Sequence, residues 1–439
     1  MNQELIDPEK ITSIEMLEQE VGKVLLLNDT GVVKMVVATI ISNRMDLDPV
    51  WLLLIAPPSG GKTELIQAVS GLEFVFPISD LTVNTFASGQ KKVGKETSLL
   101  LKINNGVMAF KDFTSILSKP NDARADIMKQ LREIYDGEYV KRTGTGDDIT
   151  WRGKIGAIGG CTEVIYRYLE QLSAMGDRFI MYSINQPDRK EVSRRMMSNA
   201  SNLPELRDHL RKCFTAFINK ILLKIYDGEI TIEESMREDL LEVADFATRA
   251  RSAVMTDFKT GAVDFVPVAE MPTRMTGQLY TLASAFIAIN KANPDLKPKH
   301  EAHNGQLTKE ETKLLFKTAF DSIPRTRRDA LYPLAQYSQG VSTAGLATHL
   351  GLPSESVRKY LSQVNALGIC TRKKDGGPQG DIWVMKQKWR DIMFKIEDLT
   401  PIEGALIGDE SGYEKESDFD IIDQYKKESE TLDTLDPDF

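Results

Sequence analysis

The chain has 439 residues, 41% hydrophobic and 27% charged, which is the balance of an ordinary globular protein and excludes a disordered or fibrous one. No apolar run approaches the roughly 20 residues of a membrane-spanning helix, and the start, MNQELIDPEK, lacks the basic and apolar regions of a secretion signal. The three cysteines, Cys161, Cys213 and Cys370, are scattered and show no metal-binding spacing. We therefore expect a cytoplasmic protein that does not enter a membrane.

Charge is distributed unevenly along the chain. The net charge is −9, but residues 396–439 contain 15 Asp and Glu against 3 Lys, so they carry −12 and the other 395 residues carry +3. A mildly basic body is compatible with binding to nucleic acid without requiring it. The acidic segment has no sustained apolar period, which predicts a disordered tail over 395–439. Such a tail could bind a replication partner or mask the basic surface by mimicking DNA.

The first half of the chain predicts an α/β domain. Residues 1–30 are expected to form a helical segment, because apolar residues recur at helical spacing from Ile14 to Val24. Over 31–191, short apolar strands alternate with helices, a pattern typical of a largely parallel sheet. The expected strands are WLLLI (51–55), EFVFPI (73–78), GVMAF (106–110), KIGAI (154–158) and RFIMYSI (178–184).

The second half predicts helices. The pattern over 192–290 is almost entirely helical, and the Pro, Gly and polar residues of 291–307 predict a linker. A compact helical module with a β-hairpin is expected over 308–394. The acidic tail then completes the chain.

A phosphate-binding loop is the clearest motif. APPSGGKT (56–63) fits the P-loop pattern with Ala56 in place of the first glycine, between an expected strand and an expected helix. Backbone N–H groups of such a turn point inward at phosphate oxygens. Lys62 would neutralise the β- and γ-phosphates of ATP, and the Thr63 hydroxyl would ligate Mg²⁺. The residues predicted to bind the nucleotide are Pro58, Ser59, Gly60, Gly61, Lys62 and Thr63.

A second strand ending in an acid is needed to hold Mg²⁺ and to polarise the attacking water. Asp112 follows the apolar strand GVMAF and is the best candidate for both roles. The residue before it is Lys111, where two adjacent acids are usual, so the division between metal binding and catalysis stays open. Asp80 is an alternative helper, although a Ser-Asp pair at the end of a strand more often caps a helix.

Three further stretches, in chain order, resemble segments of the AAA+ ATPases. KIGAIGGCTEV places Cys161 and Thr162 where the family has its first sensor of the γ-phosphate. AMGDRFIMYSI resembles the segment with the arginine finger, which implies that Arg178 reaches the site of a neighbouring subunit. EMPTRMTGQLYTLASAFIAI resembles the lid helix with the second sensor, here Arg274. The resemblance implies a P-loop AAA+ core, a helical lid and a homo-oligomeric ring, with a hexamer expected.

An insertion before the strand with the expected sensor narrows the resemblance to one branch of the AAA+ family. GEYVKRTGTGDDITWRGK (137–154) predicts a β-hairpin and resembles the pre-sensor hairpin of the MCM helicase branch, which grips single-stranded DNA in the pore. Lys141 and Arg142 would then contact phosphates, and TFASGQKKVGK (85–95) could be a second pore loop. The alternative is a surface hairpin without function. The chain departs from the branch at Lys111, at Cys161-Thr162 in place of Asn, and in having no room for a large N-terminal collar.

The C-terminal module resembles a winged helix. Residues 340–385 predict a short helix over 343–350, a turn, a second helix capped by Ser354 and a β-hairpin. In such a module the second helix enters the major groove of duplex DNA and the wing reaches the backbone. Docking of another protein is the alternative role. The expected DNA contacts are Ser356, Arg358 and Lys359 on the helix and Arg372, Lys373 and Lys374 on the wing.

These features predict an ATP-dependent DNA translocase or helicase, in the replication of a phage or mobile element. Two other hypotheses describe a protein without unwinding activity: an ATP-gated, DNA-binding assembly regulator and a helicase loader. The single acid at Asp112 favours them, because slow hydrolysis suits a timer better than a motor. Strand separation on a forked duplex discriminates between these hypotheses.

Overall fold

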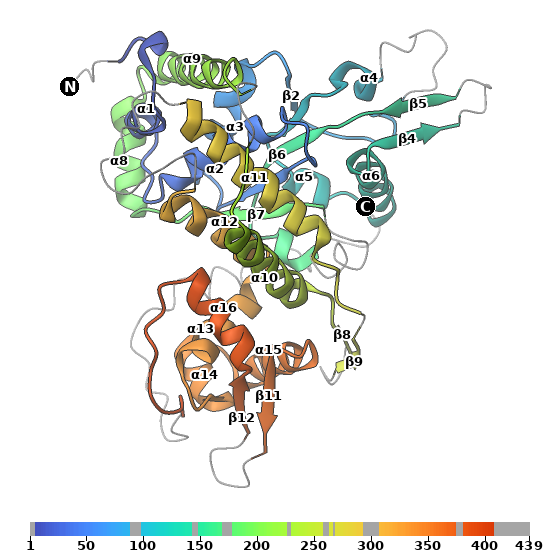
Figure 1. Cartoon of the computed structure of the whole chain (residues 1–439), viewed down its shortest axis with the longest axis vertical. Coiled ribbons are helices and arrows are strands. Elements are labelled where there is room, and N and C mark those ends of the chain that lie inside the picture. The colour runs from blue at the N-terminus through green and yellow to red at the C-terminus, as the bar shows by residue number, and fades with distance from the viewer. Residues whose placement is uncertain are drawn as a thin grey trace.

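The computed structural model describes residues 5–87, 98–142, 148–168, 178–225, 230–257, 263–266, 268–292, 307–374 and 381–407. A parallel sheet of five strands forms its centre, in the order β2-β3-β6-β1-β7 (Figure 1). Each strand overlaps one that the sequence predicts, so the α/β class and the parallel sheet are confirmed. The strands are β1 (Trp51–Ile55), β2 (Val75–Ile78), β3 (Val107–Phe110), β6 (Gly156–Cys161) and β7 (Ile180–Ser183).

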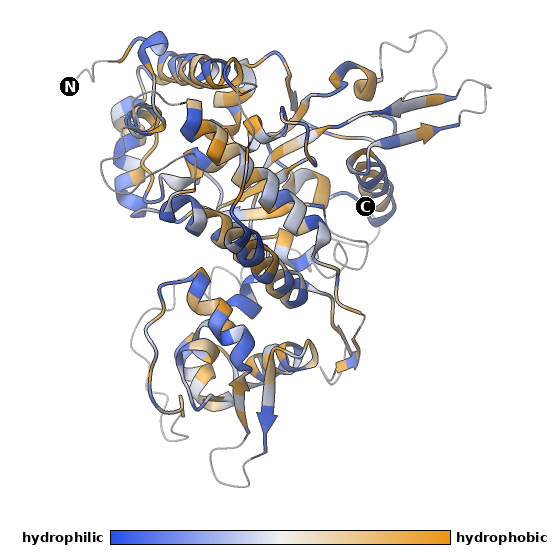
Figure 2. Ribbon diagram, viewed as in Figure 1, coloured by the Kyte–Doolittle hydropathy of each residue, from blue (hydrophilic) through white to orange (hydrophobic). Residues whose placement is uncertain are grey.

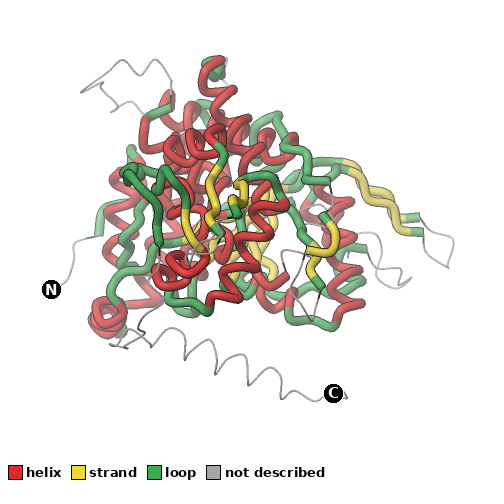
Figure 3. Tube along the Cα trace, turned by 90° about the horizontal axis from the view of Figure 1, so that it is seen from below, coloured by secondary structure: helices red, strands yellow, loops and turns green. Residues whose placement is uncertain are grey.

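Helices cover both faces of the sheet. β1 is buried along its whole length, and its residues alternate between two cores, because successive side chains of a strand point to opposite faces. Figure 3 shows the strands enclosed between helices, and Figure 2 shows the apolar residues concentrated there. One core contains α1 (Ile14–Val24), α2 (Gly31–Ser42), α3 (Lys62–Ala68), α9 (Leu203–Leu222), α10 (Glu234–Arg251) and α11 (Thr273–Ala292). The other contains α4 (Leu99–Ile103), α5 (Thr114–Leu117) and α6 (Asn121–Tyr135).

The helical region after the sheet also contains strands that the sequence did not predict. It opens with α8 (Arg189–Asn199), and a two-stranded hairpin separates α10 from α11. The hairpin consists of β8 (Met255–Thr256) and β9 (Val263–Phe265), which are too short to show an alternating pattern. No helix of the described ranges is long and apolar enough to cross a membrane.

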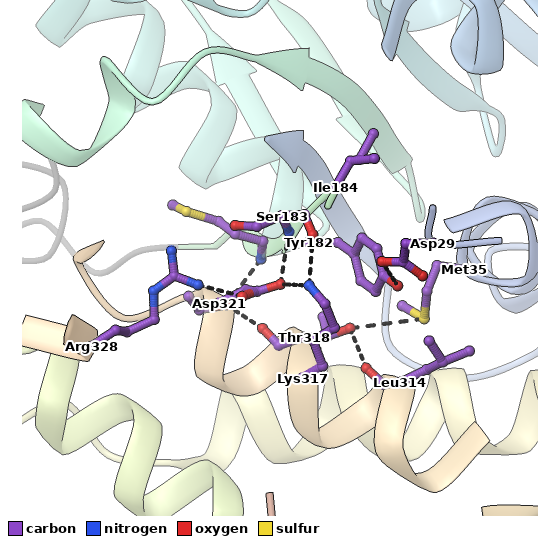
Figure 4. Close-up of polar contacts among 12 residues, drawn as sticks. Asp29, Met35, Tyr182, Ser183, Ile184, Leu314, Lys317, Thr318, Asp321 and Arg328 are labelled. Carbon is purple, nitrogen blue, oxygen red and sulfur yellow. Dashed lines mark hydrogen bonds and ion pairs between the residues drawn. The ribbon is translucent and has the colours of Figure 1, made fainter. Parts of the chain in front are cut away.

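Helix α12 (Lys309–Asp321), which the sequence assigns to the C-terminal module, lies between that module and the sheet. It packs against β7, α10 and α11 and also against α13 and α16 of the module. At its end, the Ser183 N–H donates to Asp321 Oδ2 (2.8 Å) and the Met181 N–H donates to Ser322 Oγ (2.9 Å), as Figure 4 shows for Asp321. An amphipathic pattern predicts a helix but not the surface on which the helix packs.

The C-terminal module contains four helices and a three-stranded antiparallel sheet in the order β10-β12-β11. The short helix, the second helix and the hairpin lie at the predicted positions. One detail is wrong: Ser354 is the first residue of α15, its N-cap is Pro353, and no side chain caps the helix. The elements are α13 (Arg325–Gln336), β10 (Val341–Ser342), α14 (Thr343–Leu350), α15 (Ser354–Ala366), β11 (Cys370–Lys373), β12 (Ile382–Met385) and α16 (Gln387–Ile396).

The first part of the predicted disordered tail is ordered, which is a second correction. The Ser338 N–H donates to Ile402 O (3.1 Å), and β10 exchanges hydrogen bonds with Leu406 on the side away from β12. Residues 397–407 therefore cover the free edge of β10, whose backbone groups need partners. Residues 408–439 lie outside the described residues.

A buried arginine attaches the C-terminal module to the helical region. Arg327 on α13 is 2% exposed, and its guanidinium donates to the carbonyls of Ala250 (2.9 Å) and Ser252 (2.7 Å) at the end of α10. Its Nε donates to Gln363 Oε1 on α15 (3.1 Å). The module and the helical region are thus joined by hydrogen bonds of a fully desolvated cation.

Candidate nucleotide site

The loop after β1 has a backbone shaped for anions. Ser59 and Gly61 have left-handed φ values of 62° and 83°, and such residues within a turn direct successive N–H groups to one side. At Gly60, a Cβ would lie 2.9 Å from the Ala56 Cβ and 3.0 Å from the Pro57 carbonyl, so only glycine fits. Pro58 and Ser59 are exposed at the mouth of the loop. The Gly60 N–H is bonded to the Pro57 carbonyl (3.1 Å), so the amides of Ser59 and of residues 61–63 are the ones that a ligand could use.

Lys62 lies inside this loop as a buried cation. Its side chain donates to the carbonyls of Ala56 (2.6 Å) and Pro57 (2.7 Å), and the residue is 8% exposed. Burial lowers the pKa of Lys62, and the negative charge of Asp112 opposes this shift. Within the described ranges no carboxylate pairs with Lys62. A buried ammonium with only carbonyl partners fits an anionic ligand such as a phosphate.

Thr63 and Asp112 are the residues predicted to offer oxygens to a cation. Both residues are exposed, and Asp112 follows β3 at the same edge of the sheet as the loop. Asp112 Oδ1 accepts from the Thr114 N–H (2.9 Å). Hydroxyl and carboxylate oxygens are the ligands that Mg²⁺ prefers, so the donor set fits. Among the described residues no group of three or more His, Cys, Asp and Glu could hold a metal ion, so here phosphates and waters would complete its shell.

Strand β6, which is predicted to carry the sensor, lies between β1, which precedes the loop, and β3, which precedes Asp112. A Cβ at Gly160 would lie 3.2 Å from the Lys62 Cβ, so β6 closely approaches the loop. Of the predicted pair, Cys161 is buried in the core, and burial raises the pKa of its thiol to about 12. Thr162 is half-buried at the edge of the sheet. Of the predicted pair, Thr162 is therefore the residue whose polar side chain lies at the edge of the sheet.

Thr114 is a site residue that the sequence analysis missed. Its Oγ1 accepts from the Thr162 N–H (3.1 Å) and lies 3.4 Å from the Thr162 hydroxyl. Its own N–H donates to Asp112, so one residue connects the acid to the sensor. A hydroxyl two positions after the acid is the only local signal for it.

A second missed contact joins the helical region to the loop helix. Arg207 on α9 donates from Nε to both carboxylate oxygens of Glu64 (2.9 and 3.1 Å). Glu64 directly follows Thr63, so α9 is fastened to the helix that carries the nucleotide ligands. No sequence signal connects two residues that are 143 positions apart.

Arg178 and Arg274 lie together at the opposite end of the sheet. Arg178 precedes β7, and its guanidinium pairs with Asp136 (2.8 Å). Arg274 begins α11 and pairs with Glu270 (3.3 Å). Burial raises the pKa of Tyr135, and both arginines oppose this shift, so both lie near this ring.

The length of the sheet separates these arginines from the P-loop of their own chain. Lys62 and Asp112 follow the carboxyl ends of strands, whereas Arg178 precedes an amino end. Near Arg274, a Cβ at Gly277 would lie 2.8 Å from Asp48, which precedes β1. Five residues of β1 at about 3.3 Å each give about 16 Å between the two ends.

The predicted pore hairpin projects from the domain as β4 (Glu138–Lys141) and β5 (Ile149–Arg152) (Figure 3). Lys141 donates to Asn84 Oδ1 (3.0 Å) and to the Ala87 carbonyl (2.8 Å), while Arg142 is exposed. The hairpin tip, 143–147, and the basic part of the second pore loop, 88–97, lie outside the described residues.

The predicted DNA contacts of the C-terminal module differ in availability. Arg358, Lys359, Lys373 and Lys374 are exposed, and Ser356 is half-buried. Arg372, by contrast, is ion-paired with Asp381 and lies over the Trp383 ring at 5.4 Å. Arg372 therefore holds the two strands of the hairpin together and is less available to phosphates than its neighbours.

No protein-family model matches the chain, and a search of curated proteins gives no significant match.

Proposed function

We propose that the chain is an ATPase that assembles head to tail into a ring and translocates along DNA, as in the AAA+ helicases it resembles. The observation that carries this proposal is that two sets of residues suited to phosphoryl transfer lie at opposite ends of one sheet. The loop, the acid and the sensor lie at the carboxyl ends, and two arginines lie at the amino ends. Phosphoryl transfer needs both sets near one phosphate.

The carboxyl-end residues would bind and orient ATP. The loop amides of Ser59 and of residues 61–63 would cradle the phosphates, and Lys62 would exchange its two carbonyl partners for phosphate oxygens. Thr63 and Asp112 would hold Mg²⁺, which draws charge from the phosphates when bound. Thr162, placed by Thr114, would hydrogen-bond the γ-phosphate or the attacking water.

The arginines would act in the site of a neighbouring copy. Because about 16 Å separates the two ends, Arg178 and Arg274 can stabilise the transferring phosphate only from another subunit. Arg178 would leave Asp136 and Arg274 would leave Glu270 when a phosphate offers a stronger partner. Hydrolysis would then require assembly.

Two surfaces support DNA as the partner. The β4–β5 hairpin projects with Lys141 and Arg142 at its outer end, and α15 with the adjoining hairpin exposes Arg358, Lys359, Lys373 and Lys374. The first would follow one strand in the ring's pore, and the second would bind duplex DNA as a winged helix. Both use lysine and arginine against phosphates, so binding should weaken as salt rises.

ATP-dependent strand separation on a forked duplex tests the proposal. We expect the wild type and Lys102→Ala, a change on the exposed side of α4, to unwind, and Lys62→Ala and Lys141→Ala to fail. Nucleotide binding by Lys141→Ala should stay intact, which separates the hairpin's role from the loop's. If wild-type protein hydrolyses no ATP with or without DNA, the ATPase proposal is wrong.

An ATP-gated DNA-binding assembly regulator is the second candidate. Asp112 stands alone after β3, because the preceding residue is Lys111, and a single acid favours slow turnover. If ATP is bound and DNA is held but no strand is displaced, this candidate or a helicase loader replaces the motor.

A further inference from the structure

Helix α8 is an unusual surface element because none of its eleven residues is buried. It starts directly after β7, with Asp188 as its N-cap. Only one side is attached: Arg195 donates to Gly22 O (2.9 Å), and Asn199 Nδ2 donates to Lys23 O (3.0 Å). These two contacts fix α8 against the end of α1.

The end of α1 lies beside the nucleotide loop. A Cβ at Gly61 would lie 3.7 Å from the Leu25 side chain, the residue that follows α1. The loop after β7 also reaches the nucleotide loop, because a Cβ at Gly60 would lie 3.0 Å from Gln186 Oε1. Helix α8 is therefore on the P-loop side of the molecule.

The outward side of α8 combines positive charge with an exposed methionine. Lys190, Arg194 and Met197 recur at i, i+4 and i+7, so they lie on one side of the helix, away from Arg195 and Asn199. All three are exposed, and Met197 is 72% exposed. In the described part of the chain neither Lys190 nor Arg194 makes an ion pair. Two unpaired cations around an apolar side chain form a surface that suits an acidic, apolar partner.

The complementary surface lies at the amino end of the sheet. An open cavity of about 750 Å³ is lined by Asp46, Asp48, Leu241, Thr276 and Tyr280, among others. Both carboxylates are exposed, and within the described residues neither is ion-paired. Lys154, which donates to the carbonyls of Met45 and Leu47 beside them, offsets part of their charge. Leu241 is 46% exposed. The cavity is thus acidic on one side and apolar on the other. Its negative charges are complementary to the positive charges of α8.

Helix α8 and this cavity lie on opposite flanks of one molecule. Figure 1 shows α8 at the left edge, whereas α11 begins beside β9 on the other side. A contact between the two must therefore join different copies, and it repeats head to tail. The cavity is next to Arg274, and α8 is next to the P-loop. A junction that brings Arg274 of one copy to the ATP of a neighbour therefore also brings the cavity of the first copy to α8 of the neighbour.

We infer that α8 of one copy docks into the cavity of the next copy, with Lys190 and Arg194 against Asp46 and Asp48 and with Met197 against Leu241. This inference rests on the proposed ring and names the surfaces that close it. The junction would position the arginines of one copy at the nucleotide of the other. Each site would therefore be complete only when α8 is docked.

Charge exchange across the junction tests the inference. Sedimentation velocity with Mg²⁺ and a non-hydrolysable ATP analogue would compare the assembly of four proteins. They are the wild type, a double variant with Lys190→Glu and Arg194→Glu, a double variant with Asp46→Lys and Asp48→Lys, and a variant with all four changes. Each pair of changes should raise the concentration needed for assembly at least tenfold, because it places like charges together. All four together should restore assembly to within about threefold. Lys102→Glu, at an exposed position of α4, is the control and should assemble as wild type does.

Cysteine cross-linking tests the contact directly. The thiols of Cys161, Cys213 and Cys370 are buried, and burial raises the pKa of each to about 12, so introduced cysteines dominate the reaction. A mixture of Arg194→Cys chains and Asp48→Cys chains, with a mild oxidant and the ATP analogue, should give a disulfide-linked dimer. Either variant alone should give none.

The outcomes separate this inference from the proposed function. Wild-type assembly that survives both charge-reversed pairs, or that is not restored by the four changes, overturns the inference and leaves the ring standing. Assembly without a cross-link in the cysteine mixture also overturns it. A wild type that binds a fluorescent ATP analogue but stays monomeric overturns both the inference and the ring. A wild type that binds no nucleotide overturns the proposed function itself.

Discussion

The two ends of the central sheet differ in what they offer a nucleotide. The carboxyl ends carry a glycine-rich loop, a buried lysine, an acid and a threonine pair, all within one chain. The amino ends carry two arginines, each held by a carboxylate, and an acidic cavity. Under the proposed function, the carboxyl ends would bind ATP, and the amino ends would supply the two arginines that stabilise the transferring phosphate of a neighbouring copy.

This difference suggests that binding and hydrolysis are separable properties. Binding would depend on one chain, whereas hydrolysis would depend on the contact between two. Mutations at the two ends should therefore have different signatures in the same assays.

The largest effect is expected at the amino end. Arg178→Ala should lower ATP turnover by roughly 10³- to 10⁵-fold, the usual value of an arginine finger, and should leave nucleotide affinity nearly unchanged. Steady-state ATPase rates and a fluorescent-nucleotide titration measure the two properties. Mixing Arg178→Ala with inactive Lys62→Ala should recover part of the rate, because each supplies what the other lacks. Absence of any recovery in mixed assemblies would contradict action between subunits.

The next largest effect is expected on stability, at the contact between α12 and the carboxyl end of β7. Asp321→Ala should lower the free energy of unfolding by about 3–5 kcal/mol, because it leaves buried Arg328 without its carboxylate and the Ser183 N–H without its acceptor. Denaturant unfolding measures this. Asp329→Ala, the adjacent ion-pair partner of exposed Arg325, is the matched control and should cost about 1 kcal/mol or less. Equal losses in the two variants would refute the role of the network.

A smaller effect is expected at the lysine of the loop. Lys62→Ala should weaken ATP binding by roughly 10- to 150-fold, the value of about 1.5–3 kcal/mol for a hydrogen-bonded charge. The fold should be retained, because removal of a buried ammonium also removes its desolvation cost. Calorimetric titration with ATP and Mg²⁺ measures the affinity, and circular dichroism checks the fold. Unchanged affinity would exclude the loop as the phosphate site.

The smallest effect is expected at Thr114, which connects Asp112 to Thr162. Thr114→Val should cost about 1 kcal/mol in transition-state stabilisation, a several-fold fall in kcat, because Thr162 loses its acceptor. Thr114→Ser keeps the hydroxyl and should restore most of the rate. If valine and serine behave alike, the hydroxyl has no part in placing the sensor.

The sheet was predictable from the sequence because its strands are buried on both faces. WLLLI and the other apolar runs stand out against polar turns, and each predicts a strand by itself. The strands β8, β9 and β10 were missed because each has only two or three residues. The partner of α12 and the order of 397–407 depend on contacts across long sequence separations, which no local pattern contains.

The candidate site, like the sheet, was predictable only where a local sequence pattern specifies its residues. The loop from Pro58 to Thr63 is a local motif, so its residues could be assigned from eight letters of sequence. Thr114 and Arg207 were missed because their partners lie 48 and 143 positions away. The joint placement of Arg178 and Arg274 also follows from tertiary packing alone.

The closed edge of β7 has a consequence for handling and folding of the protein. A parallel sheet with an open outer strand is a template for intermolecular β-pairing and aggregation. Here the N–H groups of Met181 and Ser183 are already bonded to side chains of Ser322 and Asp321, so that strand offers no ladder to a second chain. Chains in which α12 has not yet docked lack this protection. Aggregation during refolding should therefore depend on how fast α12 reaches the sheet.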